Sequence, residues 1–266
     1  MDAGSLGGLL LALAGILAGL LFEGGNLSQI LQPTAAMIVF GGTLGAVMLQ
    51  FPFRIVRSAA LGLVRVFFHR GGGAAALLRT IVAFANKARR KGIVSLDQDL
   101  AQVTDPFLRQ ALMLAVDGTE PSELRRIMEV QIDAVSENDA RIPAVFESAG
   151  GFSPTIGIIG AVIGLIQVMQ HLDHMDEVGR GIAVAFVATI YGVGAANLFF
   201  LPAAGKLRQR AREDQRLREM ALEGVISIVE GMNPRMIEIK LAGFQGSAAA
   251  PSVNSDQPRL VAEKRA

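Results

Sequence analysis

Two long apolar stretches without a charged side chain constrain this chain most. Residues 150–170 and 181–202 contain no Asp, Glu, Lys or Arg. A helix of about 20 apolar residues crosses the hydrocarbon core of a bilayer, so each stretch predicts one membrane-spanning helix. Backbone polar groups must be satisfied internally in lipid, and without a strong strand pattern the expected fold is helical.

Two earlier apolar stretches, residues 3–22 and 33–53, are also uncharged and predict two further crossings. Basic residues follow the second and the fourth crossing directly: Arg54, Arg57, Arg65 and Arg70, then Lys206, Arg208, Arg210 and Arg212. Basic loops stay in the cytoplasm, which places both termini there. We therefore expect an all-α integral membrane protein with four transmembrane helices, embedded in a lipid bilayer.

The rest of the chain predicts cytoplasmic helices. The expected division is transmembrane helices 1 and 2 at 3–53, a cytoplasmic helical domain at 54–149, transmembrane helices 3 and 4 at 150–202, a helical cytoplasmic stalk at 203–245 and a disordered tail at 246–266. We expect the helix before the third crossing to end near Ser148. The basic residues lie at membrane edges and need no nucleic acid to explain them.

Small residues recur at helical spacing in both halves of 150–202. They are Gly157, Gly160 and Gly164 in the third crossing, and Ala185, Ala188, Gly192 and Ala196 in the fourth. Small faces let membrane helices pack backbone to backbone. These seven positions are therefore predicted to form a helix-packing surface. The residues alone do not specify which helix packs against it.

The four crossings contain no carboxylate, Lys or Arg. Ion pathways normally need such a group at depth. Either this chain moves no ions, or a partner helix supplies the carboxylate and packs on the small faces. Thr189 is then the candidate hydroxyl, able to donate or accept. From the residues alone, a hydroxyl bonded to a carbonyl one turn earlier is the favoured interpretation.

Two prolines bracket the third and fourth crossings. Pro154 is expected in the first turn of the third crossing and Pro202 at the inner end of the fourth, where helix punctuation is the favoured interpretation. Bends that transmit a change at mid-membrane depth are the alternative.

The polar segments offer two charged clusters. Arg89 and Arg90 precede Asp97 and Asp99, and such a cluster is either a solvated surface or a docking face. The 171–177 hairpin holds His171 and His174, for which an exposed loop is favoured over a metal site. No nucleophile–base or metal constellation supports an enzyme, and no cofactor is implied.

Three segments together resemble the MotA family of bacterial flagellar motor stator proteins. They are SPTIGIIGAVIGLI at 153–166, GIAVAFVATIYGVGAANLFFLPAAGKL at 181–207 and EGVISIVEGMNP at 223–234, and ARRKGIVSLDQDL at 88–100 is similar to the cytoplasmic motif of that family. The resemblance extends from the first crossing to about Phe244. The related ExbB and TolQ proteins share the third- and fourth-helix pattern but usually have three crossings.

The resemblance implies a homopentamer in the bacterial inner membrane, around a dimer of a single-span partner, MotB, whose aspartate takes the ion. It implies an ion pathway at Thr189, Ala161 and Tyr191, functional prolines at Pro154 and Pro202, and contact of Arg89, Arg90, Asp97 and Asp99 with the rotor protein FliG.

Sodium-type members of the family tend to have a threonine where this chain has Ala161. We infer proton coupling, because a sodium-coordinating oxygen is missing there. The predicted function is a stator subunit that converts ion-motive force into torque. The alternatives are a proton-driven energiser of the ExbB/TolQ type and a passive membrane scaffold.

Overall fold

The computed structural model describes residues 3–68 and 73–245, and all the regular structure in these ranges is helical. The expected tail at 246–266 lies outside the described residues. The chain forms two compact units, each made of two segments. Unit 1 comprises Met1–Gly71 and Gln131–Gln215, and unit 2 comprises Gly72–Val130 and Arg216–Ala266.

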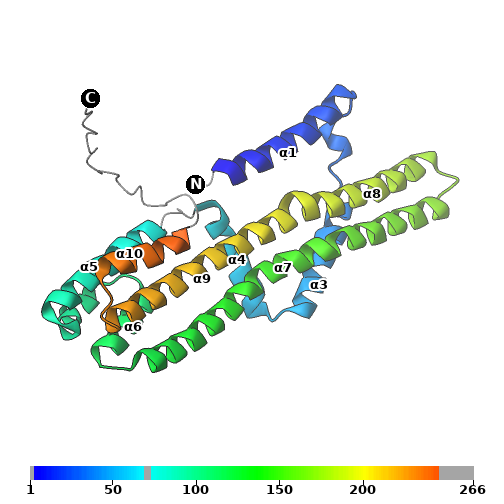
Figure 1. Cartoon of the computed structure of the whole chain (residues 1–266). Coiled ribbons are helices and arrows are strands. Elements are labelled where there is room, and N and C mark those ends of the chain that lie inside the picture. The colour runs from blue at the N-terminus through cyan, green and yellow to red at the C-terminus, as the bar shows by residue number, and fades with distance from the viewer. Residues whose placement is uncertain (1–2, 69–72, 246–266) are drawn as a thin grey trace, which may run out of the picture. The chain divides into compact units, whose positions relative to one another are not determined.

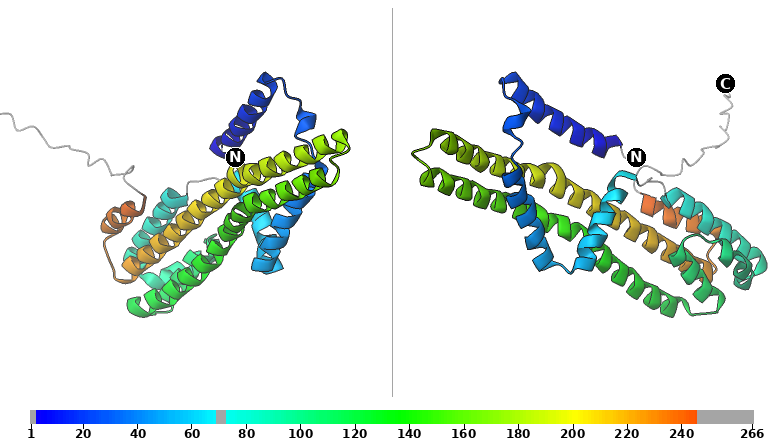
Figure 2. Two further views of the ribbon diagram at one scale, coloured as in Figure 1. Left: turned by 90° about the vertical axis from the view of Figure 1, so that its right-hand side faces the viewer. Right: turned by 180° about the vertical axis from the view of Figure 1, so that it is seen from behind.

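The first helices of unit 1 follow the apolar stretches of the sequence (Figures 1 and 2). They are α1 (Ala3–Phe22), the short η1 (Leu27–Gln29), α2 (Pro33–Ala36), the π-helical η2 (Met37–Gly41), α3 (Gly42–Gln50) and α4 (Phe53–Phe68). The second apolar helix ends at Gln50 rather than at the expected Phe53. Pro52 is the cause, because it forces Phe51 into an extended conformation, with φ −120° and ψ 140°.

Two long helices form the rest of unit 1. One is α7 (Pro121–Gln170), which contributes its residues from Gln131 onward. The other is built from α8 (Met175–Gly194), the π-helical η4 (Ala195–Phe200) and α9 (Leu201–Val229), which contributes up to Gln215. The expected end of a helix near Ser148 is wrong, because α7 continues through that position into the third apolar stretch.

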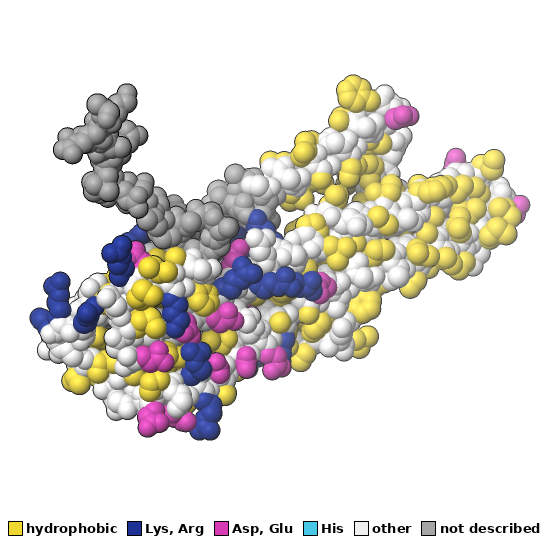
Figure 3. All heavy atoms as spheres, viewed as in Figure 1, with side chains coloured by type: hydrophobic (Ala, Val, Ile, Leu, Met, Phe, Trp, Pro, Cys, Tyr) yellow, Lys and Arg dark blue, Asp and Glu magenta, His cyan; other side chains and the backbone are white. Residues whose placement is uncertain are grey.

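Length and hydropathy single out three helices of the described residues as able to cross a membrane: Pro33–Gln50, and apolar windows within Pro121–Gln170 and Met175–Val229. Gly7–Phe22 is a shorter apolar helix by the same measure. Many of its large side chains are exposed, including Leu10, Leu11 and Phe22. On the face shown in Figure 3, hydrophobic side chains dominate the α7–α8 pair, and acidic ones lie at the tip of its hairpin.

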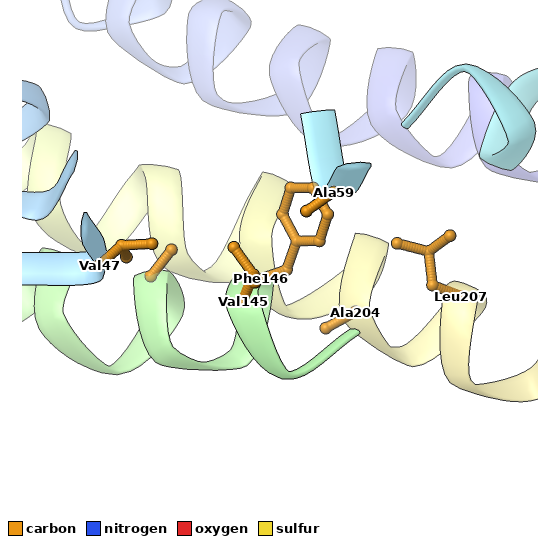
Figure 4. Packing of buried hydrophobic residues seen from close by; sticks show 7 residues of the cluster. Val47, Ala59, Val145, Phe146, Ala204 and Leu207 are labelled. Carbon is orange, nitrogen blue, oxygen red and sulfur yellow. The ribbon is translucent and has the colours of Figure 1, made fainter. Parts of the chain in front are cut away.

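A buried cluster joins α3, α4, α7 and α9 within unit 1 (Figure 4). Its members are Val47, Ala59, Val145, Phe146, Ala149, Ala204 and Leu207. An ion pair between Glu147 and Arg208 joins α7 to α9 in the same region. A second cluster packs α2 and η2 on α8, with Ala35, Val39 and Ala188 fully buried.

Unit 2 contains α5 (Gly73–Lys91), the 3-10 segment η3 (Ile93–Gln102), α6 (Pro106–Val116), the start of α7, the end of α9, α10 (Pro234–Ala242) and η5 (Gly243–Gln245). Gly92 and Gly118 end α5 and α6 with φ of +82° and +80°, where glycine is favoured. Asp105 caps α6 by accepting hydrogen bonds from the N–H groups of Phe107 and Leu108.

An ionic network centred on Glu223 joins the helices of unit 2. The Glu223 carboxylate on α9 accepts a hydrogen bond from Arg125 of α7 at 2.8 Å and pairs with Lys240 of α10. Burial alone would raise the pKa of Glu223, but the hydrogen bonds from Lys240 and Arg125 outweigh it and lower this pKa below its ordinary 4.5. The same contact with Glu223 raises the pKa of Arg125.

We predict that Glu223→Gln destabilises unit 2 by about 1–2 kcal/mol at neutral pH, because Lys240 loses this carboxylate and Arg125 keeps only its longer pair with Glu129. Since folding lowers the pKa of Glu223, its stabilising contribution is complete above pH 4.5 and is lost as the pH falls through the folded value. Thermal unfolding of the full chain at several pH values should therefore show the melting temperatures of the parent and of Glu223→Gln converging in acid. Glu137→Gln, which removes an exposed pair with Arg141, should change the melting temperature little. A constant difference between Glu223→Gln and the parent down to strong acid would contradict this.

Candidate functional site

The small faces of the third and fourth apolar stretches pack against each other within unit 1. A Cβ placed on Gly157 would stand 2.9 Å from the carbonyl oxygen of Ala188 and 3.2 Å from the Cα of Gly192. A Cβ on Gly164 would stand 2.9 Å from the backbone nitrogen of Ala185. Contacts this short leave no room for a side chain, so glycine is required at both positions.

The same seam includes the other predicted small residues. A Cβ on Gly160 would meet the Cβ of Ala188 at 2.8 Å and Ile38 of η2 at 3.3 Å. Ala185, Ala188 and Ala196 are buried. Within one chain, the occupant of the small face of α7 is therefore α8, with η2 beside it.

Thr189 lies on this seam and is half-buried. Its hydroxyl donates to the carbonyl of Ala185, one turn earlier, at 3.2 Å. This is the arrangement favoured from the residues alone, and it leaves the lone pairs of the hydroxyl able to accept. Ala161 is half-buried on α7, next to Gly160.

The hydroxyl of Tyr191 is engaged by the chain segment before α2. It donates to the carbonyl of Ile30 at 2.5 Å and accepts from the N–H of Gln32 at 3.3 Å. Its ring lies 6.0 Å from the ring of Phe40, centroid to centroid. Tyr191 therefore attaches the start of the second apolar helix to α8, a contact that no sequence pattern indicated.

Neither bracketing proline ends a helix. Pro154 lies in the interior of α7, far from the first turn of any helix, so punctuation is the wrong interpretation for it. Its ring faces the carbonyl of residue i−4, which is Gly150, where the absence of a side chain lets the backbone adjust. Pro202 is the second residue of α9 and lies two residues after the end of η4, whose π-helical turn changes the backbone near the ring and lets the helix continue.

Ser153 is a polar residue of this seam that the sequence analysis missed. Its side chain is completely buried, and its carbonyl oxygen would stand 2.6 Å from a Cβ on Gly192. It precedes Gly157 by four residues, so helical spacing already places it on the small face. That spacing was the available signal.

The charged cluster of unit 2 separates into paired and unpaired groups. Lys87 donates to Asp99 at 2.7 Å, whereas Arg89, Arg90 and Asp97 are exposed. Arg89 also lines a hollow of about 440 Å³ among the ends of α5, α6 and α9, and Glu120 is another of its lining residues. The partner of Asp99 is thus Lys87, a residue not singled out from the sequence.

The hairpin between α7 and α8 carries the two histidines. His171 lies 3.0 Å from the carbonyl of Gln167 through Nδ1, and 3.4 Å from the carboxylate of Glu177 through Nε2. Within the described ranges, no three His, Asp or Glu side chains are grouped so that they could hold a metal ion.

The uncharged segments 150–170 and 181–202 thus contact each other through glycine, which is packing typical of membrane helices. Residues 99–220 match the model of the MotA/TolQ/ExbB proton channel family. Residues 6–92 match the model of the motility protein A N-terminal region. The second match distinguishes the motility proteins from the ExbB and TolQ relatives.

The chain belongs to the motility protein A family. It is 36% identical to motility protein A of Bacillus subtilis over 243 residues, which are 91% of this chain and 90% of the relative. It is 32% identical to motility protein A of Helicobacter pylori, covering 92% and 95% of the two chains. It is also 28% identical to the chemotaxis protein PomA of Vibrio alginolyticus, over 92% of this chain and 95% of that relative.

Two solved structures share the fold. The structure of C. jejuni MotAB superimposes with a TM-score of 0.88 at 30% identity, covering 94% of this chain and 98% of that one. The flagellar MotAB stator complex from Bacillus subtilis gives 0.83 at 34% identity, covering 90% and 94%. The chain is therefore a member of a flagellar stator family and shares the fold of its solved members.

We predict that Gly192→Ala destabilises the α7–α8 seam by about 1–3 kcal/mol, because the new methyl group would meet the carbonyl of Ser153. Gly194→Ala is the matched control, since a Cβ there meets nothing within 4 Å. It should be neutral or stabilising by about 0.5–1 kcal/mol. Thermal unfolding of the two variants in detergent compares them directly, and equal melting temperatures would contradict the close contact.

Proposed function

We propose that this chain is the ion-conducting stator subunit of a bacterial flagellar motor and works with a MotB-like single-span partner. The observation that carries the proposal is the close packing of two uncharged segments, residues 150–170 of α7 and residues 181–202 of α8, η4 and α9. These segments have a mid-helix hydroxyl at Thr189 and no carboxylate. Such a pair is half of an ion site, and a partner helix completes it. The solved relatives are MotAB complexes, which supports a partner of this kind.

The proposed assembly is a homopentamer around a dimer of the partner in the inner membrane. We assign four crossings to each subunit, with α1 as the first, and place both termini in the cytoplasm. The basic residues after the second and fourth apolar stretches support this orientation. The exposed apolar side chains of α1 and α8 would then contact lipid, the partner or a neighbouring subunit.

Protonation of the partner's carboxylate would drive the motor cycle. A carboxylate in a low-dielectric site has a raised pKa, so it can load and release a proton near neutral pH. Thr189 would face that carboxylate, and its free lone pairs could accept a hydrogen bond from the protonated form. Each proton supplies about 2.3 kcal/mol per 100 mV of membrane potential.

A path from that event to the rotor would use the two long helices. Both α7 and α8–η4–α9 continue along the chain from residues of unit 1 into residues of unit 2, through Pro154 and Pro202. Prolines within continuous helices are natural bending points. A tilt at either one would move the helices of unit 2.

Proton coupling is proposed because Ala161 supplies no oxygen to a cation. We expect co-expression of this chain with its MotB-like partner to restore swimming in cells that lack their own stators. Swimming should persist when sodium is replaced by potassium, and it should stop when the proton gradient is collapsed. Swimming that needs sodium at a constant proton gradient would overturn the choice of ion. If swimming is not restored although both proteins are present in the membrane, the proposed stator function is overturned.

The exposed basic end of α5 is proposed to contact the rotor protein FliG. Arg90 is exposed, and no ion pair of its guanidinium occurs within the described residues. Arg89 and Asp97 are also exposed, whereas Asp99 is held by Lys87 and would act indirectly by fixing η3 against α5.

We predict that Arg90→Glu lowers torque severalfold and leaves protein level and ion flux unchanged, because a reversed charge repels the docking partner without disturbing the core. Tethered-cell rotation with a parallel flux assay measures both quantities. Arg79→Glu is the matched control, since Arg79 is exposed about three turns earlier on the same helix. Equal loss of torque in both variants would contradict a docking role for Arg90.

A further inference from the structure

The hydroxyl of Ser153 is a buried polar group to which the proposed mechanism assigns no role. Ser153 is 0% exposed, and its Oγ has no hydrogen-bond partner among the described residues. Hydroxyl side chains in membrane helices usually bond to a carbonyl one turn earlier. Thr43 does so to Val39 at 2.6 Å, and Thr189 does so to Ala185. Ser153 therefore differs from Thr43 and Thr189 of the same unit, whose hydroxyls each bond to a carbonyl one turn earlier.

The residue next to Ser153 frees a second polar group. Pro154 has no N–H, so it cannot donate to the carbonyl of Gly150, which is its usual helical acceptor. Gly150 is buried, and a Cβ on it would stand 2.6 Å from Leu201 at the junction of η4 and α9. Residues three apart share one face of a helix, so the hydroxyl of Ser153 and this carbonyl belong to the same side of α7.

The facing helix is irregular at the same level. Gly192 closes one side, where the carbonyl of Ser153 approaches it, and the π-helical η4 follows directly after α8. A π-helical turn widens the backbone and often marks a functional position. The hydroxyl and the carbonyl thus lie at a polar, irregular point in an otherwise apolar seam.

We propose that Ser153 and the carbonyl of Gly150 hold a water molecule in the seam between α7 and α8–η4, and that this water relays protons between the Thr189 level and the cytoplasm. The proposal rests on the proposed stator function. A buried water needs two to four polar partners, and one hydroxyl and one carbonyl supply the first two. Two oxygens are too few for a hard metal cation, which takes about six. The site therefore suits water and protons.

The relay conserves its atoms. A proton arriving from the side of Thr189 binds the water oxygen, and one of the water's own protons leaves toward the cytoplasm. Rotation of the water and of the Ser153 hydroxyl restores the starting state. No oxidant, reductant or other reactant is needed. Ser153 lies one turn from Gly157, whose position faces Thr189, so the two levels are adjacent along the seam.

If Ser153 binds no water, the opposite effect of its substitution is expected. Removing an unpaired hydroxyl from a dry apolar site is neutral or stabilising, because a buried polar group without a partner is a cost to folding. Ser153→Ala therefore separates the two possibilities. Ser148→Ala is the matched control, since Ser148 is a half-buried serine of the same helix, five residues earlier.

The experiment uses the full chain with its MotB-like partner, and it measures proton influx at a fixed membrane potential together with the melting temperature. Ser153→Ala should lower the flux about fivefold, the equivalent of one net hydrogen bond lost from the rate-limiting step. Its melting temperature should not rise, and Ser148→Ala should keep the parental flux. Unchanged flux in Ser153→Ala, or a raised melting temperature with flux retained, overturns the water site.

One further variant covers the case in which Ser153→Ala lowers both flux and melting temperature. Ser153→Cys keeps a small group that can form a weak hydrogen bond. Recovery of part of the flux supports the relay, and no recovery overturns it. The parental complex is measured first, so failure of the proposed function appears as absence of flux there. Failure of the water site alone appears as full flux in both the parent and Ser153→Ala.

Discussion

Close backbone contact between α7 and α8 is the constraint on which the rest of unit 1 depends. Gly157, Gly164 and Gly192 each face backbone atoms of the opposite helix at distances that exclude a side chain. In lipid there is no hydrophobic driving force between helices, so association relies on such packing. The contact also orients the seam, because it places Ser153 and Thr189 along one line between the two helices.

The helices α7 and α8–η4–α9 are continuous, and a continuous helix can transmit a displacement at the seam along its length. Pro154 and Pro202 would normally weaken a helix, yet each lies within one. Gly150 precedes Pro154 by one turn, and η4 ends two residues before Pro202, so the backbone has room to adjust at both prolines. The same local irregularity that allows continuity also frees polar groups inside an apolar region. A membrane helix that takes part in ion conduction can use the freed polar groups, and one that transmits motion needs the continuity.

Unit 2 is stabilised by a different kind of contact. Glu223 is held between Arg125 and Lys240, so one carboxylate joins three helices. Near it, a Cβ on Gly224 would stand 2.7 Å from Ile81 of α5, so α9 also packs closely there. A folded unit secured by an ionic network can present exposed charges such as Arg89 and Arg90 without using them for its own stability. The charges at the end of α5 are thus available to a partner.

The sequence by itself determined the apolar helices and their small faces. These follow from local rules, namely apolar stretches of spanning length and small residues at helical spacing. The absence of a carboxylate in the apolar stretches also indicated that an ion site would need a second chain.

Only the tertiary structure decided which groups meet. The partners of Tyr191, Asp99 and Glu223 come from segments 12 to 161 residues away, and no local pattern specifies them. The interior position of Pro154 was mispredicted, because a proline rule takes no account of a helix stabilised from both sides by packing. The isolation of Ser153 is likewise a property of the packed seam, since a hydroxyl lacks a partner only when the surrounding helices exclude every other one.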